Sequence, residues 1–303
     1  MARLFDAYIM VDWSAATKPV TGPNSIWVGI LAKDARLKFQ FRAINPDTRL
    51  KARTFIHDMV GKLVKRGDKV LLGFDFSFGF PMGTGDAMGF GDDVPPWQSM
   101  FEYLSGKVRE REDNSNSRFA IAAGMNYAMS KGAFPFWGAP VRDQVSTLDG
   151  KRPSFDSARP VDEFRLAERF LKERGLGQPK SCWQLAYAGS VGSQTLLGIP
   201  HIAWLAAQVP GAKIWPYDLP LEPLEEDALE TVNLVIAEIY PSLVKARPGA
   251  GQVLDEAQVE AIARHYCDLD ANDRLGPLFS GGDGLSEAEK SQITREEGWI
   301  LGI

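Results

Sequence analysis

Polar and apolar positions in the first quarter of the chain follow the pattern of a strand meander and then of a helix. Three apolar or alternating runs predict consecutive strands, at residues 7–13, 25–32 and 37–44. The polar connection between the second and third runs is short enough for a hairpin. Apolar residues then recur at spacings of three and four from Ala52 to Val64, which predicts a helix with Gly67 as its stop signal.

The remainder of the chain is regular on either side of a long irregular segment. The apolar run at 69–76 predicts a strand covered on both faces, and a similar run at 232–239 predicts another. A helix begins near Asp255, which resembles the cap of a capping box. We expect one α/β domain over residues 1–303, with 77–230 as a large insertion or cap subdomain within it. This insertion is rich in glycine, proline and aromatic residues and holds two helical patterns, at 161–174 and 196–208.

The bulk composition narrows the class of protein. The chain has 303 residues and a formal net charge of -5, so it lacks the basic excess that is typical of bulk nucleic-acid binding. It has only two cysteines, too few for a disulfide framework, and no run of about 20 apolar residues that could span a membrane. The start of the chain lacks the basic region of a secretory signal. We therefore expect a cytoplasmic protein with no membrane partner.

Acidic residues stand at the ends of the predicted buried segments. Asp12, Asp75 and Glu238 each follow the apolar run of a predicted strand. Asp270 and Asp273 continue the apolar stripe of the last predicted helix. Buried apolar segments normally carry no charge, and unpaired carboxylates there are costly. We therefore expect the five carboxylates to meet, with a divalent cation that offsets their repulsion.

An oxygen-only set of ligands favours Mg²⁺ or Mn²⁺. Two such ions can activate water and stabilise the leaving oxygen of a phosphodiester. The chain has only three histidines, too few to favour a His-rich zinc site. Two conditions apply to this interpretation. A single Asp at a strand end can simply cap a turn, and Gly276-Pro277 interrupts the last helix, so the shared face of Asp270 and Asp273 depends on where that helix ends.

These acidic residues and their neighbours resemble the DUF429 family, which is usually described as predicted nucleases of the ribonuclease H-like fold. The resemblance spans nearly the whole chain as short motifs: the segments around Asp12, Asp75, Glu238 and Asp270/Asp273, with the stretches 190–200 and 297–300. It implies a ribonuclease H-like mixed sheet, with three antiparallel strands followed by parallel strands, flanked by helices.

The resemblance also implies roles for individual residues. The catalytic set would be Asp12, Asp75, Glu238 and Asp273, and the metal ligands would be these four with Asp270. The cofactor would be Mg²⁺ or Mn²⁺, and the substrate a nucleic acid or a nucleotide. Candidate substrate-binding residues are Ser14, Ser77, Lys180, Gln184 and Gln194. The sequence therefore predicts a hydrolase, a metal-dependent phosphodiesterase of the nuclease type.

Other functional classes stay open. The same fold supports small-molecule kinases and ATPases, in which carboxylates hold Mg-nucleotide, and a non-catalytic nucleotide- or metal-binding protein could use the same pocket. Basic residues interleaved with aromatic residues between Arg109 and Arg152 could contact phosphates and bases, or could cover an ordinary core. Ala188 to Gly192 match an A-x-S-x-G variant of the nucleophile elbow, for which a glycine-rich turn is the simpler interpretation.

Overall fold

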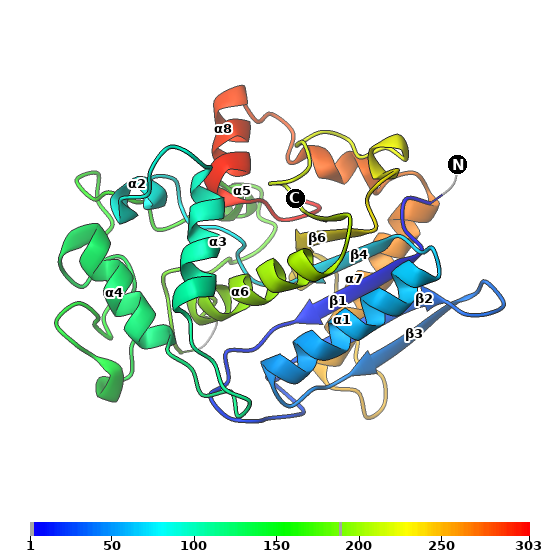
Figure 1. Cartoon of the computed structure of the whole chain (residues 1–303), viewed down its shortest axis with the longest axis horizontal. Helices are drawn as coiled ribbons and strands as arrows, with labels where there is room; N and C mark the ends of the chain where they lie inside the picture. Colours follow the sequence, from blue (N-terminus) through cyan, green and yellow to red (C-terminus); the bar gives the residue numbers. More distant parts are fainter. Residues whose placement is uncertain (1–2, 188–189) are drawn as a thin grey trace.

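A mixed sheet of six strands forms the centre of the computed structural model, which describes residues 3–187 and 190–303 (Figure 1). The strands are β1 (Ala7–Asp12), β2 (Trp27–Lys33), β3 (Phe39–Ile44), β4 (Val70–Phe74), β5 (Ala212–Ile214) and β6 (Leu234–Glu238). Their order in the sheet is β3-β2-β1-β4-β6-β5. β1, β2 and β3 pair antiparallel, whereas β1, β4, β6 and β5 are parallel. This arrangement confirms the predicted fold class, an α/β protein with a ribonuclease H-like mixed sheet.

Helices cover both faces of the sheet. The α-helices of the described residues are α1 (Arg49–Lys65), α2 (Thr84–Met88), α3 (Pro96–Lys107), α4 (Arg118–Ser130), α5 (Leu166–Glu173), α6 (Gly192–Gln208), α7 (Leu254–Ala271) and α8 (Glu287–Gln292). α1 and α6 lie on one face, and α7 lies on the other, behind β1 and β2 in Figure 1. Among the described residues, no helix combines the length and the apolar character that a membrane crossing needs.

The local sequence explains where α1 begins and ends. The hydroxyl of Thr48 accepts a hydrogen bond from the Lys51 backbone N–H in the first turn. Gly67 adopts a φ of 93°, a left-handed conformation that favours glycine, and the helix ends just before it. The predicted apolar stripe is buried, and its members include Ala52, Ile56, Met59, Val60 and Leu63.

Side chains alternate between the two faces along each central strand. In β1, Ile9 and Val11 pack in the core beneath α1 and α6, which we call the α1 face. Tyr8 and Met10 pack in the core beneath α7, which we call the α7 face. β4 and β6 follow the same alternation; their side chains on the α1 face are Val70, Leu72, Phe74, Leu234 and Ile236. This alternation decides which acidic residues can meet at the strand ends.

Two glycines allow close packing on the α7 face. A Cβ atom at Gly29 of β2 would lie 2.9 Å from the side chain of Val259 in α7. A Cβ atom at Gly73 of β4 would lie 2.6 Å from the side chain of Ile239. Any larger residue at either position would push the neighbouring side chain away from the sheet.

The segment from 77 to 230 contains α2 to α6 and also supplies β5 to the sheet. The helical patterns predicted at 161–174 and 196–208 correspond to α5 and α6. α2, α3 and α4 are grouped at the left of Figure 1, beyond the point where β1 ends. One local prediction is wrong: Asp255 is not a cap, because Val253 occupies that position and Asp255 lies in the first turn of α7.

Residues 296–301 return to the segment that follows β4. Gly79 packs directly against them, since a Cβ atom there would lie 2.5 Å from the carbonyl oxygen of Glu297. The carboxylate of Glu297 accepts hydrogen bonds from the backbone N–H groups of Met82 and Leu166, at 2.7 and 2.6 Å. These contacts hold the turn after β4 against a distant part of the chain.

Candidate functional site

Asp12 and Asp75 lie side by side at the carboxyl ends of two parallel strands. Asp12 is the last residue of β1, and Asp75 directly follows β4. The register pairs Val11 with Phe74, so Asp12 and Asp75 are level with each other, and both continue the alternation that points to the α7 face. Their carboxyl groups hydrogen-bond to each other, and the Trp13 N–H donates to Asp75 Oδ1 at 2.7 Å. Two of the predicted carboxylates therefore meet.

Burial and like charge change the titration of this pair. Burial, followed by the charges of Asp75 and Asp255, raises the pKa of Asp12 well above its usual value. Burial also raises the pKa of Asp75 to about 7, although the hydrogen bond from Trp13 acts in the opposite direction. Among the described residues, neither carboxylate forms a salt bridge with a lysine or an arginine. The pair therefore keeps a proton at pH values where ordinary aspartates are ionised.

Asp255 is a third acidic residue near the pair, and it is not among the residues predicted from the sequence. Its carboxylate accepts a hydrogen bond from the Asn24 N–H at 2.6 Å. Its negative charge contributes to the raised pKa of both Asp12 and Asp75. The signal that could have identified it is its position in the first turn of α7, because that end of the helix lies where β1 ends.

The backbone that follows β1 is tied to neighbouring helices. The side-chain N–H of Gln194, near the start of α6, donates to the carbonyl oxygen of Trp13. The carbonyl oxygen of Ser14 accepts a hydrogen bond from Arg49 at 2.9 Å. Two of the predicted substrate-binding residues, Ser14 and Gln194, thus belong to or contact the backbone segment that directly follows Asp12.

The other predicted substrate-binding residues have different surroundings. Ser77 is buried two positions after Asp75. Lys180 is exposed, and the side-chain N–H of Gln184 donates to the carbonyl oxygen of Ala186 in its own loop, at 3.1 Å. Of the five residues in the A-x-S-x-G motif, Ala188 and Gly189 lie outside the described residues.

Glu238 follows the alternation of the opposite face, so its predicted place beside Asp12 and Asp75 is wrong. The register pairs Glu238 with Phe74, rather than with Asp75. Its carboxylate accepts hydrogen bonds from Nη1 and Nη2 of the buried Arg165, at 2.8 and 2.6 Å, and one from the Phe78 N–H at 2.9 Å. Burial raises the pKa of Glu238, and Arg165 opposes that effect. An arginine therefore balances this charge.

Asp270 and Asp273 lie at the other end of the sheet, so their predicted place in the cluster is also wrong. α7 does extend to Ala271, but it carries Asp270 toward the start of β1 rather than its end. The Asp270 carboxylate accepts hydrogen bonds from the N–H groups of Leu4 and Phe5, each at 2.9 Å. Asp273 lies beyond the helix with a left-handed φ of 54°. Both aspartates line a cavity of about 580 Å³, together with Leu4.

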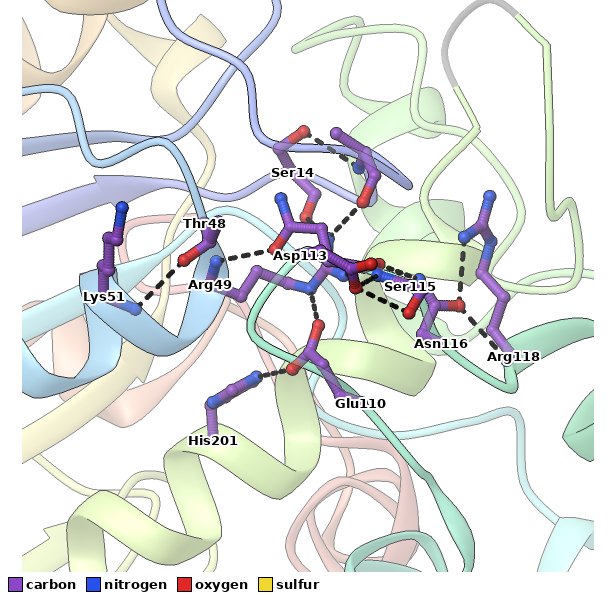
Figure 2. A network of polar contacts seen from close by, with 12 residues as sticks. Ser14, Thr48, Arg49, Lys51, Glu110, Asp113, Ser115, Asn116, Arg118 and His201 are labelled. Carbon is purple, nitrogen blue, oxygen red and sulfur yellow. Dashed lines mark hydrogen bonds and ion pairs between the residues drawn. The ribbon is translucent and has the colours of Figure 1, made fainter.

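A second polar network supports the segment after β1 (Figure 2). Arg49 is fully buried and donates from Nη1 to the Ser14 carbonyl and from Nε to the carboxylate of Glu110. The second Glu110 oxygen lies 2.7 Å from Nε2 of His201 in α6. Burial opposes ionisation of Glu110, but His201 and Arg49 together outweigh it and lower its pKa. The network joins four segments that are distant in sequence, which explains why no local pattern predicted it.

Two carboxylates alone do not make a complete set of metal ligands. Within the described parts of the chain, no group of three or more His, Cys, Asp or Glu residues is arranged to hold a metal ion. Mg²⁺, however, is commonly bound through one or two carboxylates together with water and substrate phosphate. The oxygen donors of Asp12 and Asp75 fit that mode of binding. In comparisons with known proteins, no protein-family model matches the chain, and no similar curated protein or solved structure was found.

Proposed function

We propose that the protein is a divalent-metal-dependent phosphodiester hydrolase of the nuclease type, with Asp12 and Asp75 as its metal ligands. One observation carries the proposal: two half-buried carboxylates meet at the ends of neighbouring parallel strands and share a hydrogen bond where an arginine or lysine would otherwise be expected. The resemblance to the DUF429 family points to the same chemistry. The cofactor would be Mg²⁺ or Mn²⁺, and the substrate a nucleic acid or a nucleotide.

The residues around the pair suit this role. The Trp13 N–H fixes one oxygen of Asp75, while Gln194 and Arg49 hold the backbone carbonyls of the next two residues after β1. Asp255 adds negative charge that favours a bound cation. When bound, a divalent ion would polarise a phosphoryl oxygen and lower the pKa of water at the site. The proton held by the pair must leave first, so the affinity for the ion should rise as the pH increases through about 7.

The first test is metal binding, measured by calorimetric titration of Mg²⁺ and Mn²⁺ at pH 8. We expect Asp12→Asn to weaken binding by more than ~100-fold, because loss of a direct ligand should exceed the effect of losing an outer-shell partner. Asp273→Asn is the matched control, since it removes one exposed aspartate at the opposite end of the sheet and asparagine tolerates a left-handed φ. Equal affinities in the two variants would contradict the assignment.

The second test is the reaction. Wild-type protein with Mn²⁺ is incubated with single-stranded, duplex and branched nucleic acids and, separately, with ATP. We expect cleavage of at least one polynucleotide and none by the Asp12→Asn variant. Release of inorganic phosphate from ATP, with every polynucleotide intact, would instead identify a nucleotide hydrolase or kinase and contradict the nuclease proposal.

A further inference from the structure

Arg118 is a buried arginine that lacks the ion pair its two buried counterparts have. It is the first residue of α4, and its side chain and backbone are 8% exposed. Arg49 and Arg165, the other buried arginines, each bind a carboxylate. Among the described residues, Arg118 forms no such salt bridge, and its Nε has no hydrogen-bond partner. Its Nη1 donates only to the side-chain oxygen of Asn116, at 3.1 Å.

The charges that face Arg118 leave a net positive site. Burial, and then the positive charge of Arg49, lowers the pKa of Arg118 to about 10, so the guanidinium stays charged at neutral pH. Arg142 adds a further positive charge. The acid in range is Asp143, whose carboxylate already accepts a hydrogen bond from Arg142 at 3.2 Å. A buried charge without a counter-ion is costly, and a bound anion would remove that cost.

The position of Arg118 links this charge to the acidic pair. The hairpin that precedes α4 is fixed by Asn114, whose backbone carbonyl accepts a hydrogen bond from Arg49 at 2.9 Å. Arg49 in turn holds the carbonyl oxygen of Ser14, two residues beyond Asp12. Figure 2 shows Arg118 next to Asn116, on the side of the network away from His201. Asn116 joins Arg118 to this network, because its side-chain N–H donates to the carbonyl oxygen of Asn114. Arg118 is thus connected, through that network, to the segment that continues from the proposed metal ligands.

We propose that Arg118 binds a phosphate group of the substrate on the flank of the Asp12–Asp75 pair. The planar guanidinium presents parallel N–H donors that match phosphate oxygens. The backbone N–H groups at the start of α4, a 13-residue helix, add partial positive charge at the same place. The link to hydrolysis rests on the proposed function, whereas the binding of phosphate can be measured without it.

The experiment measures binding of a fluorescent single-stranded oligonucleotide by anisotropy, in an Asp12→Asn background that prevents turnover. We expect Arg118→Gln to weaken binding about tenfold. The slope of log affinity against log salt concentration should also fall by about the value of one phosphate contact. The affinity of Arg118→Lys should lie between those of the parent and of Arg118→Gln, because lysine keeps the positive charge but lacks the planar array of N–H donors. Arg111→Gln is the matched control: it removes an exposed arginine from the same hairpin and should leave affinity within about twofold. ATP, used as a competitor, distinguishes a nucleotide from a polynucleotide as the source of the phosphate.

Thermal melting separates this role from a structural one. Because Arg118→Gln removes an uncompensated buried charge, its Tm should equal or exceed that of the Asp12→Asn parent. Equal affinities of Arg118→Gln and Arg111→Gln, or a lowered Tm in Arg118→Gln alone, would overturn the proposal, as would a parent protein that binds neither probe. If binding depends on Arg118 but wild-type protein cleaves nothing, the phosphate site stands and the proposed function fails.

Discussion

Arg165→Met should lower the free energy of unfolding by about 3–5 kcal/mol, the range found when one partner of a buried ion pair is removed. Arg165 is 0% exposed and binds two carboxylates, those of Glu168 and Glu238. It also donates to the carbonyl oxygen of Glu297 at 2.9 Å. Methionine keeps much of the volume but leaves both carboxylates buried without a counter-ion. Chemical denaturation at pH 8, followed by tryptophan fluorescence and circular dichroism, measures the loss.

The pH dependence provides a second signature of the same cluster. Glu238 already has a raised pKa in the folded protein because of burial, and loss of Arg165 should raise it further. A folded-state pKa above the unfolded value favours the folded state at low pH, and this advantage is lost as the pH rises through the folded pKa. The loss of free energy of unfolding in Arg165→Met should therefore be smaller at pH 5 than at pH 8. Arg152→Met, which removes an exposed arginine paired with Glu163, should cost no more than about 1 kcal/mol. A similar small loss at Arg165 would contradict the buried-cluster interpretation.

Asp75→Asn should abolish hydrolysis and stabilise the metal-free protein at the same time. Burial raises the pKa of Asp75 from 3.8 to about 7, so between these values the folded protein binds more protons than the unfolded chain. The contribution of this group to stability therefore falls as the pH rises through about 7. Above that pH, asparagine removes one of two adjacent negative charges. We expect a gain of about 2 kcal/mol at pH 8 and a much smaller change at pH 5.

Added Mg²⁺ should reverse this order of stability. Wild-type protein gains stability from a ligand that binds only the folded state, whereas Asp75→Asn gains little. Thermal melts at pH 8 with and without Mg²⁺ measure both effects, and a hydrolysis assay should show a loss of more than ~100-fold. If Asp75→Asn were less stable than wild type without metal, the pair would be an ordinary structural contact and the metal site would lose its main support.

The sequence predicts the sheet well because its strands are short apolar runs with clear limits. The three-stranded meander, α1 and the two central strands after it all lie within a few residues of the predicted ranges. Asp12 and Asp75 were found because both directly end such runs. Their meeting follows from one register, which places Val11 beside Phe74.

The rest of the candidate site depends on relations that no single segment contains. Glu238 also ends an apolar run, but its register with Phe74 gives it the opposite face, and a shift of one residue would have reversed that result. Asp270 lies on the apolar face of α7, as predicted. The sequence pattern, however, does not show which end of that helix packs against which end of the sheet. The same helix direction brings Asp255 toward the pair. Arg165, which neutralises Glu238, is 73 positions away from it in sequence.

The return of residues 296–301 to the turn after β4 has a consequence for how the protein is made. Met82 and the carboxylate of Glu297 are 215 positions apart, and Phe78 and Glu238 are 160 apart. Contacts that close such long loops form late, because the entropy of closure opposes them until the rest of the fold is in place. During translation the turn behind Asp75 acquires the second of these partners, Glu297, only after residue 297 has left the ribosome. The edge of the sheet that carries Asp12 and Asp75 is therefore completed by one of the last events of folding.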